Sequence, residues 1–224
     1  MKENQVLKMV LLGLTTIAML VTMYLIFIWV PTEEAMGVVQ RIFYLHVPLA
    51  WLAFLAFFIV FIGSTMYLWK RHEKWDVLAH SSAEVGVAFT TLFLMTGIIW
   101  AKPVWGAWWI WDPRLTAALV LWLMYLAYLI IRPYTTDEQR GARFAAIIGI
   151  VGFIDVPIVA LAISLWRTQH PSAVIFEGGL VSSMLATLLV SLVAFTLLYV
   201  LLLTLRIAIR KDERELKRLK GLHD

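Results

Sequence analysis

Six long runs of apolar residues dominate the sequence and limit the folds it can adopt. A helix rises about 1.5 Å per residue and the hydrocarbon core of a bilayer is about 30 Å thick, so roughly 20 apolar residues can cross it. The runs cover residues 9–30, 47–69, 81–101, 115–131, 144–166 and 178–205. They are too long and too uniformly apolar for barrel strands, and a lipid-embedded backbone must pair its own polar groups. The sequence therefore predicts an all-α, polytopic membrane protein: a single domain, residues 1–224, of six transmembrane helices.

Composition excludes several other classes of protein. Hydrophobic residues make up 62% of the 224 positions and charged residues 15%, whereas soluble domains have about 45–50% and about 25%. The chain has no cysteine, which excludes disulfides, thiolate metal sites, cysteine nucleophiles and covalent attachment of haem to this chain. The net charge of +4 comes from cations scattered along loop flanks, so we expect the lipid bilayer and no nucleic acid as a partner.

Lysine and arginine are divided unevenly between the two sides of the predicted bundle. Fifteen lie at the chain ends and in the loops after the second and fourth runs, against four elsewhere: Arg41, Lys102, Arg114 and Arg167. The positive-inside rule then places both termini in the cytoplasm and turns loops 31–46, 102–114 and 167–177 outward. On the cytoplasmic side we expect residues 206–224 to form a solvated tail, helical over 210–220, and His72, His80 and His223 to be solvated.

A dense tryptophan cluster marks the outer side. Five of the eleven tryptophans fall within twelve residues: Trp100, Trp105, Trp108, Trp109 and Trp111. Ordinary enrichment at a membrane interface accounts for one or two tryptophans per helix end. The cluster instead predicts a flat apolar platform with a few N–H donors, suited to a large planar ligand or to a partner protein.

Two histidines, His46 and His170, flank this platform on the outer side. A pair of imidazoles can serve as opposed axial ligands of haem iron, whose in-plane nitrogens come from the porphyrin. A bare zinc or copper ion needs a third or fourth protein ligand, and the outer loops supply few carboxylates. We expect Val39, Phe43 and His46 to share one helical face, with Pro48 opening the second span.

The outer cations suit the carboxylates of such a ligand. Haem carries two propionates, and an arginine holds a carboxylate in a two-point fork. Arg114 is the strongest candidate because it closes the tryptophan run. Arg41, Lys102 and Arg167 lie close to the histidines or the platform, and each can equally be an interfacial cation that extends its charge into water.

The residues of this segment carry a resemblance to a known family. Residues 102–116 contain Trp105-Gly106, Trp109, Trp111-Asp112 and Arg114-Leu115-Thr116. This pattern resembles the W-G-x-x-W-x-W-D-x-R-L-T signature of the WWD domain, which marks haem-handling membrane proteins of cytochrome c biogenesis. Six spans, with one outer histidine on each side of the motif, resemble the cytochrome c maturation protein C (haem exporter protein C) family in particular. One departure is Leu165-Trp166, where that family has paired tryptophans.

The resemblance implies a bacterial inner-membrane protein that holds haem b non-covalently on its periplasmic face. Its site would comprise His46 and His170 as axial ligands of the iron, together with Trp105, Trp108, Trp109, Trp111, Asp112, Arg114, Arg41 and Arg167. It also implies delivery of the haem to a chaperone, cytochrome c maturation protein E. A small single-span protein D and the ABC transporter subunits A and B would complete the complex. Such a protein is a haem carrier rather than a conventional enzyme, and no catalytic residue is assigned.

Two other functions are compatible with the residues. One is a permease that moves haem or another substrate through the bundle, because Asp155 lies in mid-span two residues before Pro157. A charge there costs roughly 2.5–3.5 kcal/mol and is often functional. The other is an assembly scaffold that uses the tryptophans for docking and binds no cofactor. We expect Asp155 to be structural, neutral or hydrogen-bonded, and to support a bend at Pro157.

Overall fold

The computed structural model describes residues 2–135, 137–166, 170 and 180–220, and every regular element in these ranges is helical. The elements are α1 (Lys2–Tyr24), the π-helical turn η1 (Leu25–Trp29), the 3₁₀ turn η2 (Val38–Ile42), α2 (Phe43–Lys70), α3 (Glu73–Trp105), α4 (Pro113–Ile130), α5 (Glu138–Phe153), α6 (Asp155–Leu165) and α7 (Ser182–Lys220). Six helical segments are long and apolar enough to cross a membrane. The predicted all-helical fold with six spans is therefore confirmed.

Several helices extend beyond the apolar runs that predict them. α3 begins at Glu73, eight residues before the third run, because His72 caps it by accepting a hydrogen bond from the Lys74 N–H at 3.2 Å. α7 continues without interruption through the charged tail to Lys220. The fifth run is two helices, α5 and α6, divided at Ile154. Pro157, three residues later, has no N–H to offer the Phe153 carbonyl, which favours a break at this point.

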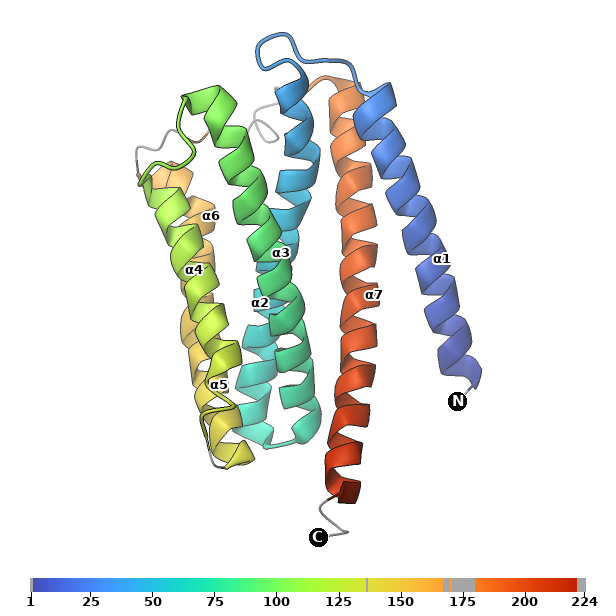
Figure 1. The fold of residues 1–224 in the computed structure, drawn as a ribbon, viewed down its shortest axis with the longest axis vertical. Coiled ribbons are helices and arrows are strands. Elements are labelled where there is room, and N and C mark those ends of the chain that lie inside the picture. Colours follow the sequence, from blue (N-terminus) through green and yellow to red (C-terminus); the bar gives the residue numbers. More distant parts are fainter. Residues whose placement is uncertain (1, 136, 167–169, 171–179, 221–224) are drawn as a thin grey trace.

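The helices form one bundle with α2 and α3 at its centre (Figure 1). α4, α5 and α6 lie on one side, and α7 and then α1 lie on the other. The α1–α2 and α3–α4 connections share one end of the bundle with His46, which we call the His46 end. Both termini and the α2–α3 and α4–α5 connections lie at the opposite end, here the tail end.

α2 and α3 make the most extensive helix contact in the bundle, and small residues allow it. A Cβ atom on Gly86 of α3 would lie 2.8 Å from a ring carbon of Phe57 and 2.9 Å from the Ala56 side chain on α2. Close backbone approach through glycine and alanine is the usual way in which helices associate in lipid. Phe57 also stacks on Tyr125 of α4, with ring centroids 3.6 Å apart, so the same contact anchors α4.

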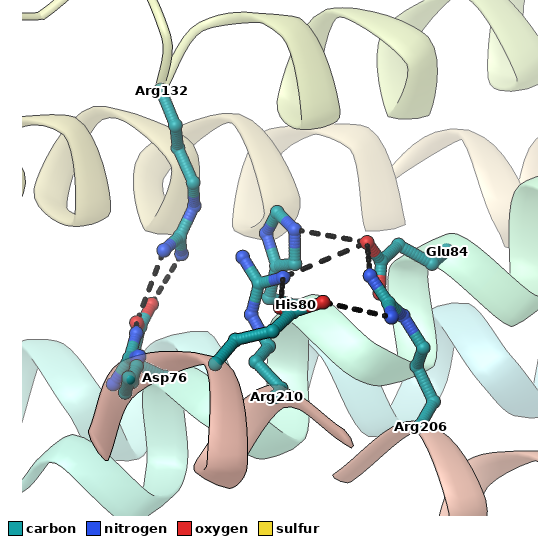
Figure 2. Close-up of polar contacts among 8 residues, drawn as sticks. Asp76, His80, Glu84, Arg132, Arg206 and Arg210 are labelled. Atoms are coloured by element: carbon teal, nitrogen blue, oxygen red, sulfur yellow. Dashed lines mark hydrogen bonds and ion pairs between the residues drawn. The ribbon is translucent and has the colours of Figure 1, made fainter. Parts of the chain in front are cut away.

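At the tail end, α3 and α7 are joined by ion pairs (Figure 2), in which Asp76 is buried and Glu84 and Arg206 are partly exposed. The α3 residues are Asp76, His80 and Glu84, and the α7 residues are Arg206, Arg210 and Arg214. Each set has a spacing of four, so each set lies on one face of its helix. We call these six residues, together with Arg132 from the α4–α5 connection, the charge ladder. It ties three parts of the bundle together.

The contacts of the ladder follow the antiparallel course of α3 and α7. Arg206 donates to Glu84 through Nε at 2.5 Å and Nη2 at 2.8 Å, and Arg210 lies 3.6 Å from the same carboxylate. Arg214 donates to Asp76 at 2.5 Å. Arg132 holds Asp76 with both terminal nitrogens, one of them at 3.0 Å. Burial works to lower the pKa of the Arg132 guanidinium, but its hydrogen bond to Asp76 outweighs this and raises the pKa, so Arg132 stays charged.

One expectation for this end is wrong, because His80 is not solvated: it is only 6% exposed, and its Nε2 lies 3.4 Å from Glu84. The helix predicted over 210–220 is confirmed, and the residues of 211–220 other than Arg214 are exposed. The tail is nevertheless not free, because Arg206, Arg210 and Arg214 pack against α3. Charges that look solvated in the sequence are paired here because α3 extends to meet them. His223 lies outside the described residues.

Asp76→Asn tests the charge ladder. Asp76 is 4% exposed and pairs with two arginines. Its neutralisation leaves Arg132 without a counter-charge, whereas Arg214 keeps its ion pair with Glu73 at 2.7 Å. We expect the free energy of unfolding to fall by about 3–5 kcal/mol, measured by thermal unfolding in detergent or nanodiscs. The control is Asp137→Asn, because Asp137 pairs with Arg140 at 3.6 Å on the surface, and an exposed pair contributes at most about 1 kcal/mol. Equal stability of the two variants would contradict the assignment.

Candidate functional site

A cavity of about 240 Å³ opens at the His46 end of the bundle. Its walls come from η2, α2, α3, α4 and the start of α7, and from the connections between helices, which supply Trp109, His170 and one carboxylate, Glu33. Most of its lining residues are apolar. Six of them were singled out by the tryptophan cluster, the outer histidines and the outer cations: His46, His170, Trp100, Trp105, Trp109 and Arg114. The fold therefore brings both histidines to one cavity, although they are far apart in the sequence.

His46 lies in the first turn of α2 and packs against α3. Its ring lies 4.7 Å from the Phe93 ring, and its Nδ1 lies 3.0 Å from the Thr96 hydroxyl. Phe43 lines the cavity beside His46, as the predicted shared face requires, but Val39 belongs to η2 and is not among the lining residues. The helix also begins at Phe43 rather than at Pro48, which lies in its second turn and offers no N–H to the Tyr44 carbonyl.

His170 also lines the cavity. Its ring lies 6.5 Å from the Trp100 ring, inclined at 34°. Trp100 in turn meets Trp105 edge-on at 5.3 Å, so the second histidine adjoins the tryptophan cluster. Arg167, which was expected to lie beside it, falls outside the described residues.

The motif at residues 102–116 combines structural and lining residues. Gly106 has a φ of +76°, which ends α3, and its N–H bonds to the Lys102 carbonyl at 3.0 Å. Asp112 is buried and caps α4 by accepting the Arg114 N–H at 2.9 Å, with Pro113 as the first helical residue. These two turns point Trp105 and Trp109 into the cavity lining.

The structure does not bring all predicted platform tryptophans together. Trp108 and Trp111 are 58% and 76% exposed and do not line the cavity. The Trp111 ring meets the Trp109 ring edge-on, with centroids 5.7 Å apart, so the exposed Trp111 adjoins a residue of the cavity wall. Trp100, which the sequence groups with the cluster without assigning it to the site, is a lining residue.

The outer cations have different surroundings. Arg114 lines the cavity. Arg41 instead donates to the Phe27 carbonyl at 2.9 Å, which ties η2 to η1 and keeps this arginine away from the lining. Lys102 donates to the Gly106 carbonyl at 3.0 Å and lies over the Trp108 ring. Within the described part of the chain, Arg114 is thus the one of these cations that faces the cavity.

Three lining residues carry buried polar atoms that have no hydrogen-bond partner within the described ranges. Arg114 Nη1 and Trp109 Nε1 are donors, and Gln40 Oε1 is an acceptor. Buried polar atoms are normally hydrogen-bonded, so atoms of this kind around one cavity suit a bound ligand. The apolar walls, two imidazoles and unused guanidinium donor fit haem with its carboxylates. Gln40, Met36 and Met184 also line the cavity, and no local sequence pattern distinguishes them.

Asp155 is separate from this cavity. It starts α6, and its buried Oδ2 has no hydrogen-bond partner in the described residues. A hydrogen bond to this oxygen is therefore not observed in the described residues, and the neutral carboxyl expected for Asp155 stays a prediction.

Comparisons with known proteins agree with the family resemblance of the motif at residues 102–116. The sequence model of the family described as heme exporter protein C matches residues 1–220. Heme exporter protein C of Bradyrhizobium diazoefficiens is 38% identical over 195 residues, which cover 86% of this chain and 73% of that protein. The protein of the same name from Escherichia coli K12 is 29% identical over 165 residues, 74% of this chain and 67% of its own length. A ccmC-like mitochondrial protein of Marchantia polymorpha, named for cytochrome c biosynthesis, is 35% identical over 153 residues, 68% of this chain and 64% of that protein.

Asp112 provides a test of the motif's structural part. Asp112→Ala removes the α4 cap and should lower stability by about 1 kcal/mol, whereas Asp112→Asn keeps the cap. We expect the asparagine variant to match the parent protein in thermal unfolding and in haem bound per protein, measured by absorption. An asparagine variant that is stable but has lost haem would show instead that the carboxylate acts on the ligand.

Proposed function

The chain belongs to the heme exporter protein C family of cytochrome c biogenesis, and we propose that it binds haem and delivers it at the outer face of the bacterial inner membrane. The recipient is the periplasmic haem chaperone, cytochrome c maturation protein E. The observation that carries the proposal is one cavity lined by two histidines, three tryptophans and an arginine, with a buried nitrogen of that arginine left unpaired by the described residues. On this proposal the protein is a carrier of non-covalent haem b rather than an enzyme.

Each lining residue has a distinct role in this proposal. His46 and His170 supply the two axial nitrogens to the iron. Trp100, Trp105 and Trp109 cover the porphyrin with aromatic and apolar surface. Arg114 pairs with a propionate, because Nη1 is an unused donor in a cavity wall and a charged carboxylate is its best acceptor.

The exposed tryptophans are the proposed docking face for the chaperone. Trp108 and Trp111 lie outside the cavity but within the loop that carries Trp109. Large exposed aromatic side chains next to a binding site are typical of protein contacts. Protein D and the ABC transporter subunits A and B are proposed as further partners on family membership alone.

The orientation of the bundle follows the positive-inside rule. The tail end carries the basic residues of the loops after α2 and α4 and of α7, so it faces the cytoplasm in this proposal. The His46 end then faces the periplasm, where the chaperone would take up the haem.

Passage of a substrate through the bundle has less support than delivery at one face. Toward the tail end, the interior is filled by the Phe57–Tyr125 stack and by Tyr128, all fully buried. Asp155, which favours the permease alternative, is not a lining residue of the cavity. We therefore keep delivery at the outer face as the proposed function.

Replacement of the histidines tests the site. His46→Ala and His170→Ala should each lose most of the bound haem, and added imidazole should partly restore a low-spin spectrum by filling the open position. The absorption spectrum of the purified protein measures both effects. His72→Ala is the control, because His72 caps α3 at the tail end. Unchanged spectra in both outer variants would contradict the axial-ligand roles, and a parent protein without a Soret band would favour the scaffold.

The tryptophans should separate into two groups. Trp105→Ala and Trp109→Ala remove cavity walls and should weaken haem retention, since each aromatic contact contributes about 0.5–1.5 kcal/mol beyond burial. Trp108→Ala and Trp111→Ala should retain haem but transfer less of it to the chaperone. Haem bound per protein and the yield of haem-loaded chaperone are the two measurements. Equal effects of all four variants on retention would refute this division.

A further inference from the structure

A single turn of α3 surrounds the imidazole of His46. Thr96 Oγ1 lies 3.0 Å from His46 Nδ1, and the Phe93 ring packs on the imidazole at 4.7 Å. A Cβ atom on Gly97 would lie 3.1 Å from His46 Cε1, so glycine leaves the space that the ring occupies. The ring is thus held on α3 by a hydrogen bond to Thr96 and an aromatic contact with Phe93, in the space left by the absence of a side chain at Gly97.

The direction of this hydrogen bond follows from the other contacts of Thr96. Its hydroxyl lies 2.9 Å from the Leu92 carbonyl and 3.0 Å from the Phe93 carbonyl, and a carbonyl can only accept. When the hydroxyl proton goes to either carbonyl, the oxygen faces His46 with a lone pair. Nδ1 is then the donor in this contact. This arrangement makes two hydrogen bonds, whereas donation from Thr96 to His46 would make one. The Phe93 backbone also hydrogen-bonds the His46 ring, and a carbonyl can only accept from a ring N–H.

We propose that Thr96 is a positioning residue that fixes His46 as the Nδ1–H tautomer and leaves the Nε2 lone pair for a ligand in the cavity. The bond made by one ring nitrogen sets the state of the other, and histidines that bind metals usually donate their second N–H in this way. The identity of the ligand as haem rests on the proposed function. The tautomer is a property of the haem-free protein and can be measured without it.

The first experiment is ¹⁵N NMR of the full-length, haem-free protein labelled at histidine, at a mildly alkaline pH where imidazole is neutral. His46→Ala assigns the His46 signals. We expect Nδ1 to carry the proton in the parent protein and in Thr96→Ser, and a mixture of tautomers in Thr96→Val. A parent protein with the proton on Nε2, or an unchanged tautomer in Thr96→Val, would overturn the proposal.

The second experiment titrates the same proteins with ferric haem and follows the absorption spectrum. Thr96→Val should bind haem about 10–100-fold more weakly, the usual effect of removing an outer partner of a metal ligand. Thr96→Ser should match the parent protein. Equal affinity of the parent protein and Thr96→Val would contradict the positioning role.

Thr91→Val is the matched control for the loss of a hydrogen bond. Thr91 also lies on α3, donates to the Val87 carbonyl at 2.8 Å and accepts from Trp122 Nε1 at 2.9 Å. We expect it to leave haem affinity unchanged, and an equal loss in both variants would reduce Thr96 to a general structural role. If His46→Ala keeps full haem affinity, the axial-ligand role in the proposed function fails, while the NMR result still decides the tautomer.

Discussion

The close packing of α2 against α3 is the contact on which the rest of the structure depends. Hydrophobicity does not drive helices together in lipid, so their register is set by shape and hydrogen bonds. Gly86 admits Phe57 and Ala56, and Ser82 of α3 donates to the Ala56 carbonyl at 2.8 Å. This register carries His46 to the Thr96 turn at one end of the pair. Tyr199 of α7 lies 2.8 Å from the Ser82 hydroxyl, so α7 is placed by the same contact.

Buried polar groups lie at both ends of the bundle, but their surroundings differ. At the tail end, the carboxylates of the charge ladder are paired with arginines of other segments. The pairing offsets the free-energy cost of removing these charges from water and joins the segments to one another. At the His46 end, Arg114, Trp109 and Gln40 keep buried atoms that the described residues do not pair. Within the described residues such atoms also occur at the tail end, among them Trp75 Nε1, His80 Nδ1 and Ser81 Oγ. What distinguishes the three at the His46 end is that they adjoin an apolar cavity, and because an unpaired buried atom costs free energy, this is the physical reason to place a polar-edged ligand there.

The tryptophan motif owes its residue pattern to two different requirements. Gly106 and Asp112 form the turns that end α3 and start α4. Those turns place three residues in the cavity lining: Trp105, Trp109 and Arg114. Trp108 and Trp111 lie outside the cavity and are exposed. The motif therefore determines both the conformation of the loop and part of the cavity wall. In the proposed function, the tryptophans that line the cavity retain haem, and the exposed tryptophans contact the chaperone.

The sequence by itself determined the six spans, because the length and hydropathy of each run decide locally whether a helix can cross a membrane. It also determined the candidate histidines and the motif, since both consist of residues readable one segment at a time. Tertiary structure decided which of the candidate residues come together in one site. Trp100 joins the cavity and Arg41 does not, Thr96 meets His46 across two helices, and His80 is buried in the charge ladder. Each outcome depends on the rotation and register of neighbouring helices, which arise from packing between segments far apart in the chain.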